Sequence, residues 1–379
     1  MSDKSEKQQL SVEHVIEQHL AILKGLQYDS GLFAASSKAV STGYDKSWLR
    51  DNFYECLAFA VLKDYETVRK TVRALLDIFL KHEYKIDHAI SAKPQHKHEY
   101  IHARFHPQTL DEFWEEWGNK QNDSIGAILF LIGELEFNKV HVLLTGADYR
   151  IVQKLVSYLG SLEYWKDPDS GMWEENEEVH SSSVGACVAG LFSIKRVPRI
   201  HVPVELIRNG RLTLNKLLPR ESTQKFADLA QLSLIYPYHI TTPAQTREIL
   251  KNVEYHLVKE RGVIRYKGDC YYNKNPDGKS EEAEWTFGFS WLAIIYHNLG
   301  DAEKAAFYEK KTRETVNEKG EVPELYFSNS PEYNHNSPLG WSESLFIVAL
   351  YELNKKHVNP SHVLKDAADA PMLRHFSMN

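Results

Sequence analysis

The chain has 379 residues, 42% of them hydrophobic, and its 45 lysines and arginines stand against 52 aspartates and glutamates, a formal net charge of −7 at pH 7. This apolar fraction is that of a globular protein rather than a disordered one, and the acidic balance argues against nucleic acid or an anionic membrane surface as the main partner. No stretch approaches the ~18 uninterrupted apolar residues that a membrane span needs.

The first residues and the cysteines indicate the compartment. The N-terminal segment MSDKSEKQQLSVEH is charged and has no apolar core, so we expect no secretory signal. The chain has three cysteines, Cys56, Cys187 and Cys270, and no two of them are close in sequence. This argues against a disulfide framework and a Cys-based zinc site. We therefore expect a cytoplasmic protein with no metal and no cofactor.

Hydrophobic residues recur at helical spacing along most of the chain, and few segments alternate as strands do. Asp123 and Ser181 are residue types that begin helices, Pro243 suits a first helical turn, and Gly300 followed by Asp301 is typical of a tight helix–helix connection. Twelve helices are predicted, over residues 11–25, 48–63, 66–83, 123–138, 148–163, 181–195, 203–217, 225–235, 243–259, 285–299, 301–316 and 340–355.

The predicted helices alternate in character. Residues 301–316 contain eight charged side chains, whereas residues 285–300 contain no lysine, arginine, aspartate or glutamate. A helix that is apolar on every side must be buried, and one with a charged stripe lies outside. The pattern predicts an all-α (α/α)₆ barrel of six inner and six outer helices, filling residues 1–379 as one domain with short tails at about 1–10 and 358–379. A helical solenoid is the alternative, but no repeat of about 34 or 40 residues is present.

The longest irregular connections precede the predicted inner helices that start near 48, 123, 181, 285 and 340. In an alternating barrel these connections open at the same end, where sites are usually built. Each of the five contains carboxylates and at least one Trp or Tyr. Aromatic rings that cover the apolar faces of a sugar, together with charged groups that hold its hydroxyls, are typical of a carbohydrate site. We expect Trp48, Trp173 and Trp341 on one face.

Each of these features also has a plain structural explanation. Asp123 and Ser181 can be helix caps, Arg50 with Asp51 can be solvated surface charges, and Trp291, inside an inner helix, can be core. Taken singly, no motif decides between the two interpretations. Their convergence on one end of the barrel favours a functional site.

Five stretches in these connections resemble the signature segments of glycoside hydrolase family 15, the glucoamylases and related α-glucosidases. They are WLRD at 48–51, WGNKQND at 117–123, DSGMWEEN at 169–176, RYKGDCYY at 265–272, and VPELYF with PLGWS across 322–342. The VPELYF form is also similar to the family-15-like domain of phosphorylase kinase regulatory subunits. The resemblance implies an (α/α)₆ barrel that hydrolyses α-glucosidic bonds with inversion, releasing glucose from the non-reducing ends of short oligosaccharides.

The resemblance also implies roles for particular residues. Glu174 would be the general acid and Glu324 the general base, and an inverting pair holds its carboxyl groups about 6.5–9.5 Å apart to admit water. Because the Pro-Glu-Leu context of Glu324 departs from the family's usual Ser-Glu, Glu321 and Glu343 stay open as bases. The implied substrate-binding residues are Trp48, Arg50, Asp51, Trp117, Asp123, Trp173, Glu175, Arg265 and Trp341.

Two other functions stay open. A non-catalytic, sugar-sensing regulatory module, as in phosphorylase kinase subunits, would keep the same barrel. A helical scaffold for protein partners would leave the clustered tryptophans and acids unexplained. We expect a small oligosaccharide as the partner.

Overall fold

The computed structural model describes residues 11–115, 118–272, 281–358 and 360–363. Within them, outer and inner helices alternate along the chain as predicted. The outer helices are α1 (Val12–Leu26), α3 (Tyr65–Lys81), α6 (Gly146–Leu162), α8 (Val204–Leu217), α10 (Pro243–His256) and α12 (Ala302–Arg313). The inner helices are α2 (Leu49–Val61), α5 (Asn122–Phe137), α7 (Ser181–Ile194), α9 (Leu232–Ile235), α11 (Phe287–Asn298) and α13 (Gly340–Asn354).

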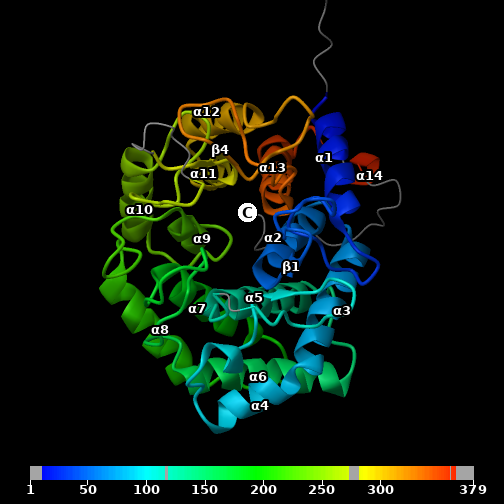
Figure 1. Ribbon diagram of the computed structural model, residues 1–379, viewed down its shortest axis with the longest axis vertical. Coiled ribbons are helices and arrows are strands. Elements are labelled where there is room, and N and C mark those ends of the chain that lie inside the picture. Colours follow the sequence, from blue (N-terminus) through cyan, green and yellow to red (C-terminus); the bar gives the residue numbers. More distant parts are fainter. Residues whose placement is uncertain (1–10, 116–117, 273–280, 359, 364–379) are drawn as a thin grey trace, which may run out of the picture.

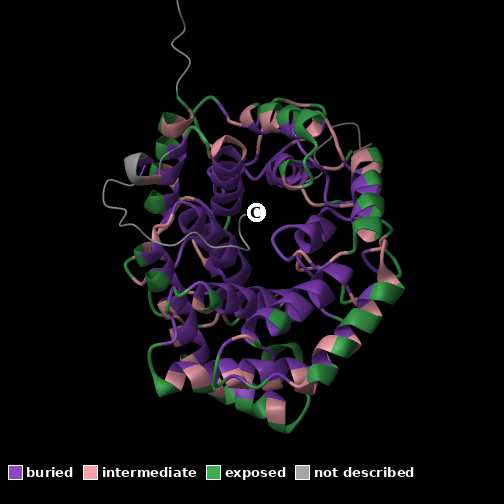
Figure 2. Cartoon of the chain, turned by 180° about the vertical axis from the view of Figure 1, so that it is seen from behind, coloured by how far each residue is buried: buried purple, intermediate pink, exposed green. Residues whose placement is uncertain are grey.

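The inner helices form a closed ring. Helix α2 packs on α5, α5 on α7, α7 on α9, α9 on α11, α11 on α13, and α13 back on α2. Figure 1 shows the inner helices around the centre of the molecule, with α8, α10 and α12 outside them. Every residue of α2 is buried, whereas α12 buries only Ala305, Tyr308 and Thr312. Figure 2 shows the same division, with buried residues around the centre and exposed ones at the periphery. The predicted (α/α)₆ barrel is confirmed.

The ring is tight where α5 and α7 meet, because glycines let the two backbones approach. A Cβ atom on Gly126 of α5 would lie 2.5 Å from the backbone of Ala186 in α7. A Cβ atom on Gly190 of α7 would overlap the carbonyl oxygen of Gly126. Neither backbone can move aside without shifting its helix, so these two positions require glycine.

The predicted helix over 225–235 is wrong in its first half. The chain instead turns at Ser222, whose Oγ accepts from the backbone N–H groups of residues 224 and 225. A 3₁₀ turn, η2 (Leu229–Gln231), then begins where the Asp228 side chain caps it, and α9 follows. Helix α9 ends before Pro237, since proline has no N–H to continue it. Periodicity alone did not reveal these local side-chain bonds.

Several short elements were not predicted. They are α4 (Glu83–Ser91), η1 (Lys97–Glu99), α14 (Pro360–Val363), and two antiparallel ladders, β1 (Ser47–Trp48) with β2 (Arg104–Phe105) and β3 (Glu284–Trp285) with β4 (Leu325–Tyr326). The ladders tie together connections that are distant in sequence. The expected tail 1–10 and most of 358–379 lie outside the described residues, and the one-domain division stays a prediction. In the described part, no helix combines the length and apolarity that a membrane crossing needs.

Candidate active site

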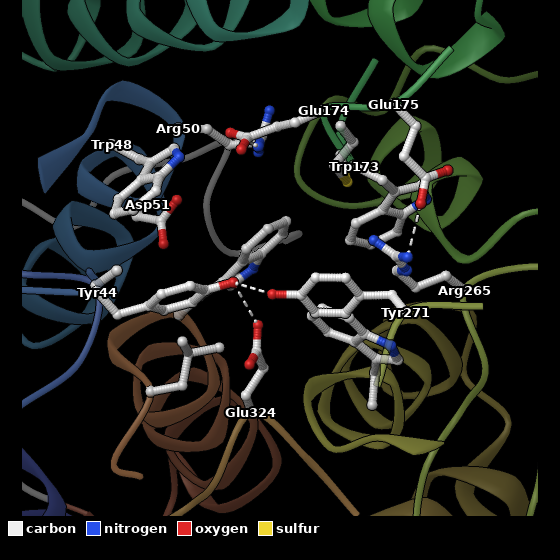
Figure 3. A pocket seen from close by; sticks show the side chains of 15 residues that line it. Tyr44, Trp48, Arg50, Asp51, Trp173, Glu174, Glu175, Arg265, Tyr271 and Glu324 are labelled. Atoms are coloured by element: carbon white, nitrogen blue, oxygen red, sulfur yellow. Dashed lines mark hydrogen bonds and ion pairs between the residues drawn. The ribbon is translucent and has the colours of Figure 1, made fainter. Parts of the chain in front are cut away.

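A pocket of about 240 Å³ opens where the inner helices α2, α11 and α13 begin. Four of the five predicted connections line it. Its wall consists of Ala35, Tyr44, Trp48, Arg50, Asp51, Met172, Trp173, Glu174, Glu175, Arg265, Tyr271, Trp285, Glu324, Leu339 and Trp341. Trp48, Trp173 and Trp341 therefore share one face, as predicted. Figure 3 shows the charged members around the pocket, with Glu174 and Glu324 on opposite sides.

Aromatic rings form one wall of the pocket. Trp341 stacks on Tyr54 at 4.3 Å between centroids and on Phe287 at 4.6 Å, with nearly parallel planes. Trp173 lies 6.2 Å from Trp341, and its indole nitrogen donates to Asp228 at 2.8 Å. Because each ring is held by others, the wall is rigid before any ligand arrives, and its ring faces suit the apolar face of a sugar.

Arg50 occupies the first turn of α2 and is buried. Its Nη1 donates to Asp123 Oδ2 at 3.0 Å and to Gln121 Oε1 at 2.9 Å, and its Nη2 lies 3.4 Å from Glu174 Oε1. Asp123, predicted to bind substrate, lies behind Arg50 rather than in the pocket wall, because its short side chain is buried in the first turn of α5. Asp123 therefore acts on the pocket indirectly, by holding the Arg50 side chain that lines it. Trp117, the other predicted binder in this connection, lies outside the described residues.

Glu174 lies in a tight reversal of the chain between Asp169 and Glu178, whose backbones exchange hydrogen bonds of 2.8 and 2.9 Å. Its φ is +63°, a left-handed conformation that costs energy for a side chain and that is common at functional sites. Gln121 Nε2 donates to Glu174 Oε1 at 2.9 Å. A Cβ atom on Gly118 would lie 2.9 Å from the Glu174 carbonyl oxygen, so the connection before α5 supports this reversal closely.

Glu175 points to a different set of partners. Arg265 Nη2 donates to its Oε1 at 2.7 Å, and the Tyr266 hydroxyl and Lys225 Nζ reach its Oε2 at 2.5 and 3.3 Å. Burial favours the neutral acid, but the Arg265 charge, with Tyr266 and Lys225, lowers the pKa of Glu175 below its usual value. Arg265 is fixed from behind by Asp269 at 2.6 and 2.7 Å. Glu175 is therefore an anion that orients Arg265.

Glu324 is buried on the far side of the pocket. The Tyr44 hydroxyl donates to its Oε1 at 3.0 Å, and the side-chain amides of Asn334 and Asn336 donate to its Oε2 at 2.5 and 2.7 Å. Burial raises the pKa of Glu324 above its usual value, and these three donors act against the rise. Three donors suit a carboxylate, which only accepts. The Tyr271 hydroxyl completes the cluster, 2.8 Å from that of Tyr44.

The two rival bases have structural partners. Glu343 Oε2 lies 2.6 Å from His19 Nδ1, and its Oε1 accepts from the backbone N–H of Val322 at 2.7 Å, so it links α13 to α1. Glu321 accepts from Ser337 Oγ at 2.9 Å. Among the described residues that line the pocket, neither appears. Glu324 is thus the candidate base that the pocket presents.

Asp51 is a further carboxyl in the pocket wall. Burial raises the pKa of Asp51 to about 7. The positive charge of Arg50 opposes this rise, and the negative charges of Glu174 and Glu324 add to it. Asp51 therefore titrates close to neutral pH. Over the ranges that the structure describes, no group of three or more His, Cys, Asp or Glu side chains is placed to hold a metal ion.

The predicted site residues that line the pocket are Trp48, Arg50, Asp51, Trp173, Glu174, Glu175, Arg265, Glu324 and Trp341. Sequence reasoning missed Tyr44, Tyr271 and Trp285 as lining residues. All three lie in connections that were singled out, and their aromatic character was the available signal. Asn334 and Asn336, which hold Glu324, carried no such signal.

Comparison with known proteins identifies the relatives of this barrel. The sequence model for glycosyl hydrolases family 15 matches residues 13–198. The resemblance to family 15 is confirmed. The matched part of this family-15-like chain includes Arg50, Asp51, Glu174 and Glu175, whereas Glu324 lies beyond it.

Two kinds of protein are found among the curated relatives of the family-15-like chain. The phosphorylase b kinase regulatory subunit alpha of rabbit (Oryctolagus cuniculus, skeletal muscle isoform) is 26% identical over 80% of this chain and 30% of that protein. An uncharacterized glycosyl hydrolase of Methanocaldococcus jannaschii is 25% identical over 62% of this chain and 42% of that protein. The chain spans about a third of the length of the kinase subunits that it matches.

Solved structures share the fold. A wild-type glycosidase superposes with a TM-score of 0.77 at 17% identity, over 90% of this chain and 96% of that one. The glucoamylase of Saccharomycopsis fibuligera gives 0.63 at 15%, over 91% and 95%. A bacterial glucoamylase in complex with acarbose gives 0.68 at 15%, over 93% and 57%. At such identities the likeness is one of fold, and the chain shares the barrel fold of these glycosidase and glucoamylase structures.

Proposed function

We propose that this chain is a glycoside hydrolase that removes glucose from the non-reducing end of short α-glucosides with inversion of configuration. The observation that carries the proposal is the placement of Glu174 and Glu324 on opposite sides of one pocket (Figure 3). Inverting hydrolysis needs two carboxyl groups in this relation, one to protonate the leaving oxygen and one to activate water on the other face of the sugar.

The rest of the pocket supports a sugar as the ligand. Arg50 and Asp51 offer charged groups for hydroxyls, and the stacked wall around Trp341 offers an apolar surface for the ring. The volume of about 240 Å³ is below the ~300–1,000 Å³ that pockets for drug-sized ligands span, so we infer that the end of a glucoside enters rather than its middle. One structural neighbour, a variant of a glycosidase, is in complex with glucose.

In the proposed reaction Glu174, as the acid, gives its proton to the glycosidic oxygen as the bond from that oxygen to the anomeric carbon breaks. A water molecule attacks that carbon from the opposite face and loses a proton to the Glu324 carboxylate. The hydrogen bonds from Tyr44, Asn334 and Asn336 orient Glu324 toward this water. The Glu175–Arg265 pair holds the sugar that leaves. The first product is β-glucose.

The experiment is incubation with maltose, isomaltose, trehalose and longer maltooligosaccharides, with the anomer of released glucose followed by NMR. We expect β-glucose first, and Glu324→Ala should abolish release while sugar binding stays measurable by calorimetry. Azide can occupy the space that Glu324→Ala vacates, attack the anomeric carbon while Glu174 protonates the leaving oxygen, and give β-glucosyl azide. Release of α-glucose first from the non-reducing end of maltooligosaccharides would contradict the inverting assignment, whereas inverting cleavage of trehalose gives one β-glucose and one α-glucose as the leaving sugar.

The second candidate is a regulatory module that binds sugar without cleaving it. It is favoured by the kinase regulatory subunits, which match between 80% and 89% of this chain. Sugar binding by the wild-type chain without glucose release from any member of the panel would select this function.

A further inference from the structure

The connection between α1 and α2 contains an exposed loop, residues 37–46, that lies next to the proposed base. Residues 38, 39, 41 and 42 are exposed, whereas Ala35 and Ser36 just before the loop are buried. Two backbone hydrogen bonds close the stem of the loop. The Ser36 N–H donates to the Tyr44 carbonyl at 2.8 Å, and the Ala35 N–H donates to the Lys46 carbonyl at 3.0 Å. The 37–46 loop is therefore an exposed turn on a fixed stem.

Two side chains of the 37–46 loop act on different oxygens of Glu324. The Tyr44 hydroxyl donates directly to Oε1 (Figure 3). The Thr42 hydroxyl donates to Asn336 Oδ1 at 2.6 Å, and Asn336 Nδ2 in turn donates to Glu324 Oε2 at 2.7 Å. One surface loop thus holds both ends of the buried carboxyl group, once directly and once through an amide.

The side-chain amide of Asn336 has a defined direction because its two ends have different partners. Glu324 as a carboxylate can only accept, so it needs the Nδ2 end of the amide. The Thr42 hydroxyl donates to the Oδ1 end, which keeps Nδ2 turned toward Glu324. Asn336 is fully buried, and its carbonyl accepts from the Glu324 N–H at 3.0 Å, so its backbone is already fixed to the base. Rotation of the amide is the freedom that the Thr42 hydroxyl restricts.

The hydrogen bond from Asn336 matters for the charge of the base. Burial raises the pKa of Glu324, and this bond is the largest of the effects that lower it, ahead of the bonds from Asn334 and Tyr44 and the charge of Arg265. Other titratable groups that interact electrostatically with Glu324 are Asp51, Tyr271 and Tyr272. Thr42 contacts Asn336 and so bears on the donor that does most to keep Glu324 ionised.

We propose that Thr42 is a positioning residue for the base, acting through Asn336 to keep a donor on Glu324 Oε2. Its kinetic consequence rests on the proposed hydrolysis, whereas its effect on the carboxyl group can be measured without turnover. When the Thr42 hydroxyl is removed, the amide turns more freely and Oε2 loses its donor for part of the time. The neutral acid is then favoured, and less of the carboxylate is present at a given pH.

The test is the titration midpoint of the Glu324 carboxyl group in variants of the full chain. Protein with carbon-13-labelled glutamate is followed by NMR over a series of pH values, and the signal lost in Glu324→Gln identifies the group. Thr42→Val puts a methyl group in place of the hydroxyl, so the midpoint should rise by about 0.5–1 pH unit. Thr42→Ser keeps a hydroxyl and should restore the wild-type midpoint. The matched control is Ser41→Ala, which removes an exposed hydroxyl from the same loop and should change nothing.

A double substitution tests the route through the amide. Asn336→Ala has no amide to orient, so adding Thr42→Val should shift the midpoint no further. If Asn336→Ala does not fold, Tyr44→Phe takes its place. Tyr44 holds the other oxygen, so its shift and that of Thr42→Val should add. The proposal is overturned by an unchanged midpoint in Thr42→Val, by a full further shift in the Asn336→Ala background, or by shifts that fail to add in Tyr44→Phe.

Glucose release separates this proposal from the proposed function. In a chain that hydrolyses maltose, the acid limb of kcat/KM should move up with the midpoint in Thr42→Val and return in Thr42→Ser. Hydrolysis in which neither the limb nor the midpoint moves overturns the role of Thr42 and leaves the proposed function standing. A midpoint that shifts in a chain that releases no glucose refutes the proposed hydrolysis and supports the role of Thr42.

Discussion

Glu174 and Glu175 are neighbours in the chain, but their side chains face different surroundings. Glu174 contacts Gln121 and Arg50 on its own side of the pocket, whereas Glu175 contacts Arg265 and two further donors that favour its anionic form. A group held as an anion is a poor proton donor near neutral pH. The anionic partners of Glu175 are the reason that we propose Glu174, rather than Glu175, as the acid.

The first prediction compares Glu174→Gln with Glu175→Gln. Glutamine at 174 keeps the shape but has no proton to give, so kcat should fall by roughly 10²–10⁴ with little change in Tm. Glutamine at 175 removes one of the two carboxylates that pair with Arg265, Asp269 being the other, so KM should rise more than kcat falls. Steady-state kinetics on maltooligosaccharides separates the two effects. A larger loss of kcat in Glu175→Gln would reverse the assignment.

The second prediction concerns the acid side of the pH profile. If Glu324 is the base, activity falls as pH drops through its pKa, because only the carboxylate can take a proton from water. Tyr44→Phe removes one donor to that carboxylate, which raises the pKa of Glu324 further and moves the acid limb of kcat/KM to higher pH. Tyr326→Phe is the control, since its hydroxyl donates to a backbone carbonyl at 315 instead. If the acid limb does not move in Tyr44→Phe, Glu324 is not the general base.

At the scale of elements, the inner helices are set by how closely their backbones approach. Helices α5 and α7 touch through Gly126 and Gly190, and both helices bring connections to the site, at Gln121 and at Glu174. The spacing of the two helices therefore also sets how Gln121 reaches Glu174. Small residues at this crossing serve the site as well as the core.

The third prediction follows from that crossing. Gly190→Ala places a methyl group against the backbone of Gly126, and overpacking of this kind costs about 1–3 kcal/mol of the free energy of unfolding. The control is Gly146→Ala at the start of α6, where a Cβ atom meets nothing within 4 Å and stability should be kept or slightly raised. Urea unfolding of both variants measures the difference. Equal stability would show that the two helices can separate without cost.

Across the whole molecule, ionisable groups are buried behind the site. His180 precedes α7, its ring lies against Gly171 of the chain reversal that carries Glu174, and its Nδ1 is 3.5 Å from Glu221 Oε1. Burial opposes its charge, but the hydrogen bond with Glu221 and the charges of Asp169 and Glu221 raise the pKa of His180 to about 9. We therefore expect the protonation of His180 to contribute to the stability of the fold.

The fourth prediction is the pH dependence of stability. Because the folded pKa of His180 lies above the unfolded value of about 6.5, its contribution is fully present below pH ~6.5 and is lost as pH rises through about 9. His180→Gln should lower the free energy of unfolding by about 3 kcal/mol at pH 6, and the gap should narrow above pH 9. His201→Gln, on an exposed connection, is the control. Denaturant titrations from pH 5 to 10 measure both, and a gap independent of pH would contradict the charge assignment.

The sequence by itself determined the barrel and most of the pocket. Helices apolar on every side, such as residues 285–299, had to lie inside helices with one charged stripe, and this alternation leads to the ring. The connections before the inner helices then had to open at one end, which placed Trp48, Trp173 and Trp341 together. These conclusions needed only periodicity and chain order, which are local properties.

Only the tertiary structure decided how side chains from distant connections meet. The paths of irregular connections bring Asn334 and Asn336 to Glu324 and place Asp123 behind Arg50. Those paths are fixed by two-residue ladders such as β1 with β2, too short to give a periodic pattern. The spacing of apolar residues within a helix predicts its buried face. The conformation of a connection instead depends on partners far away in the sequence.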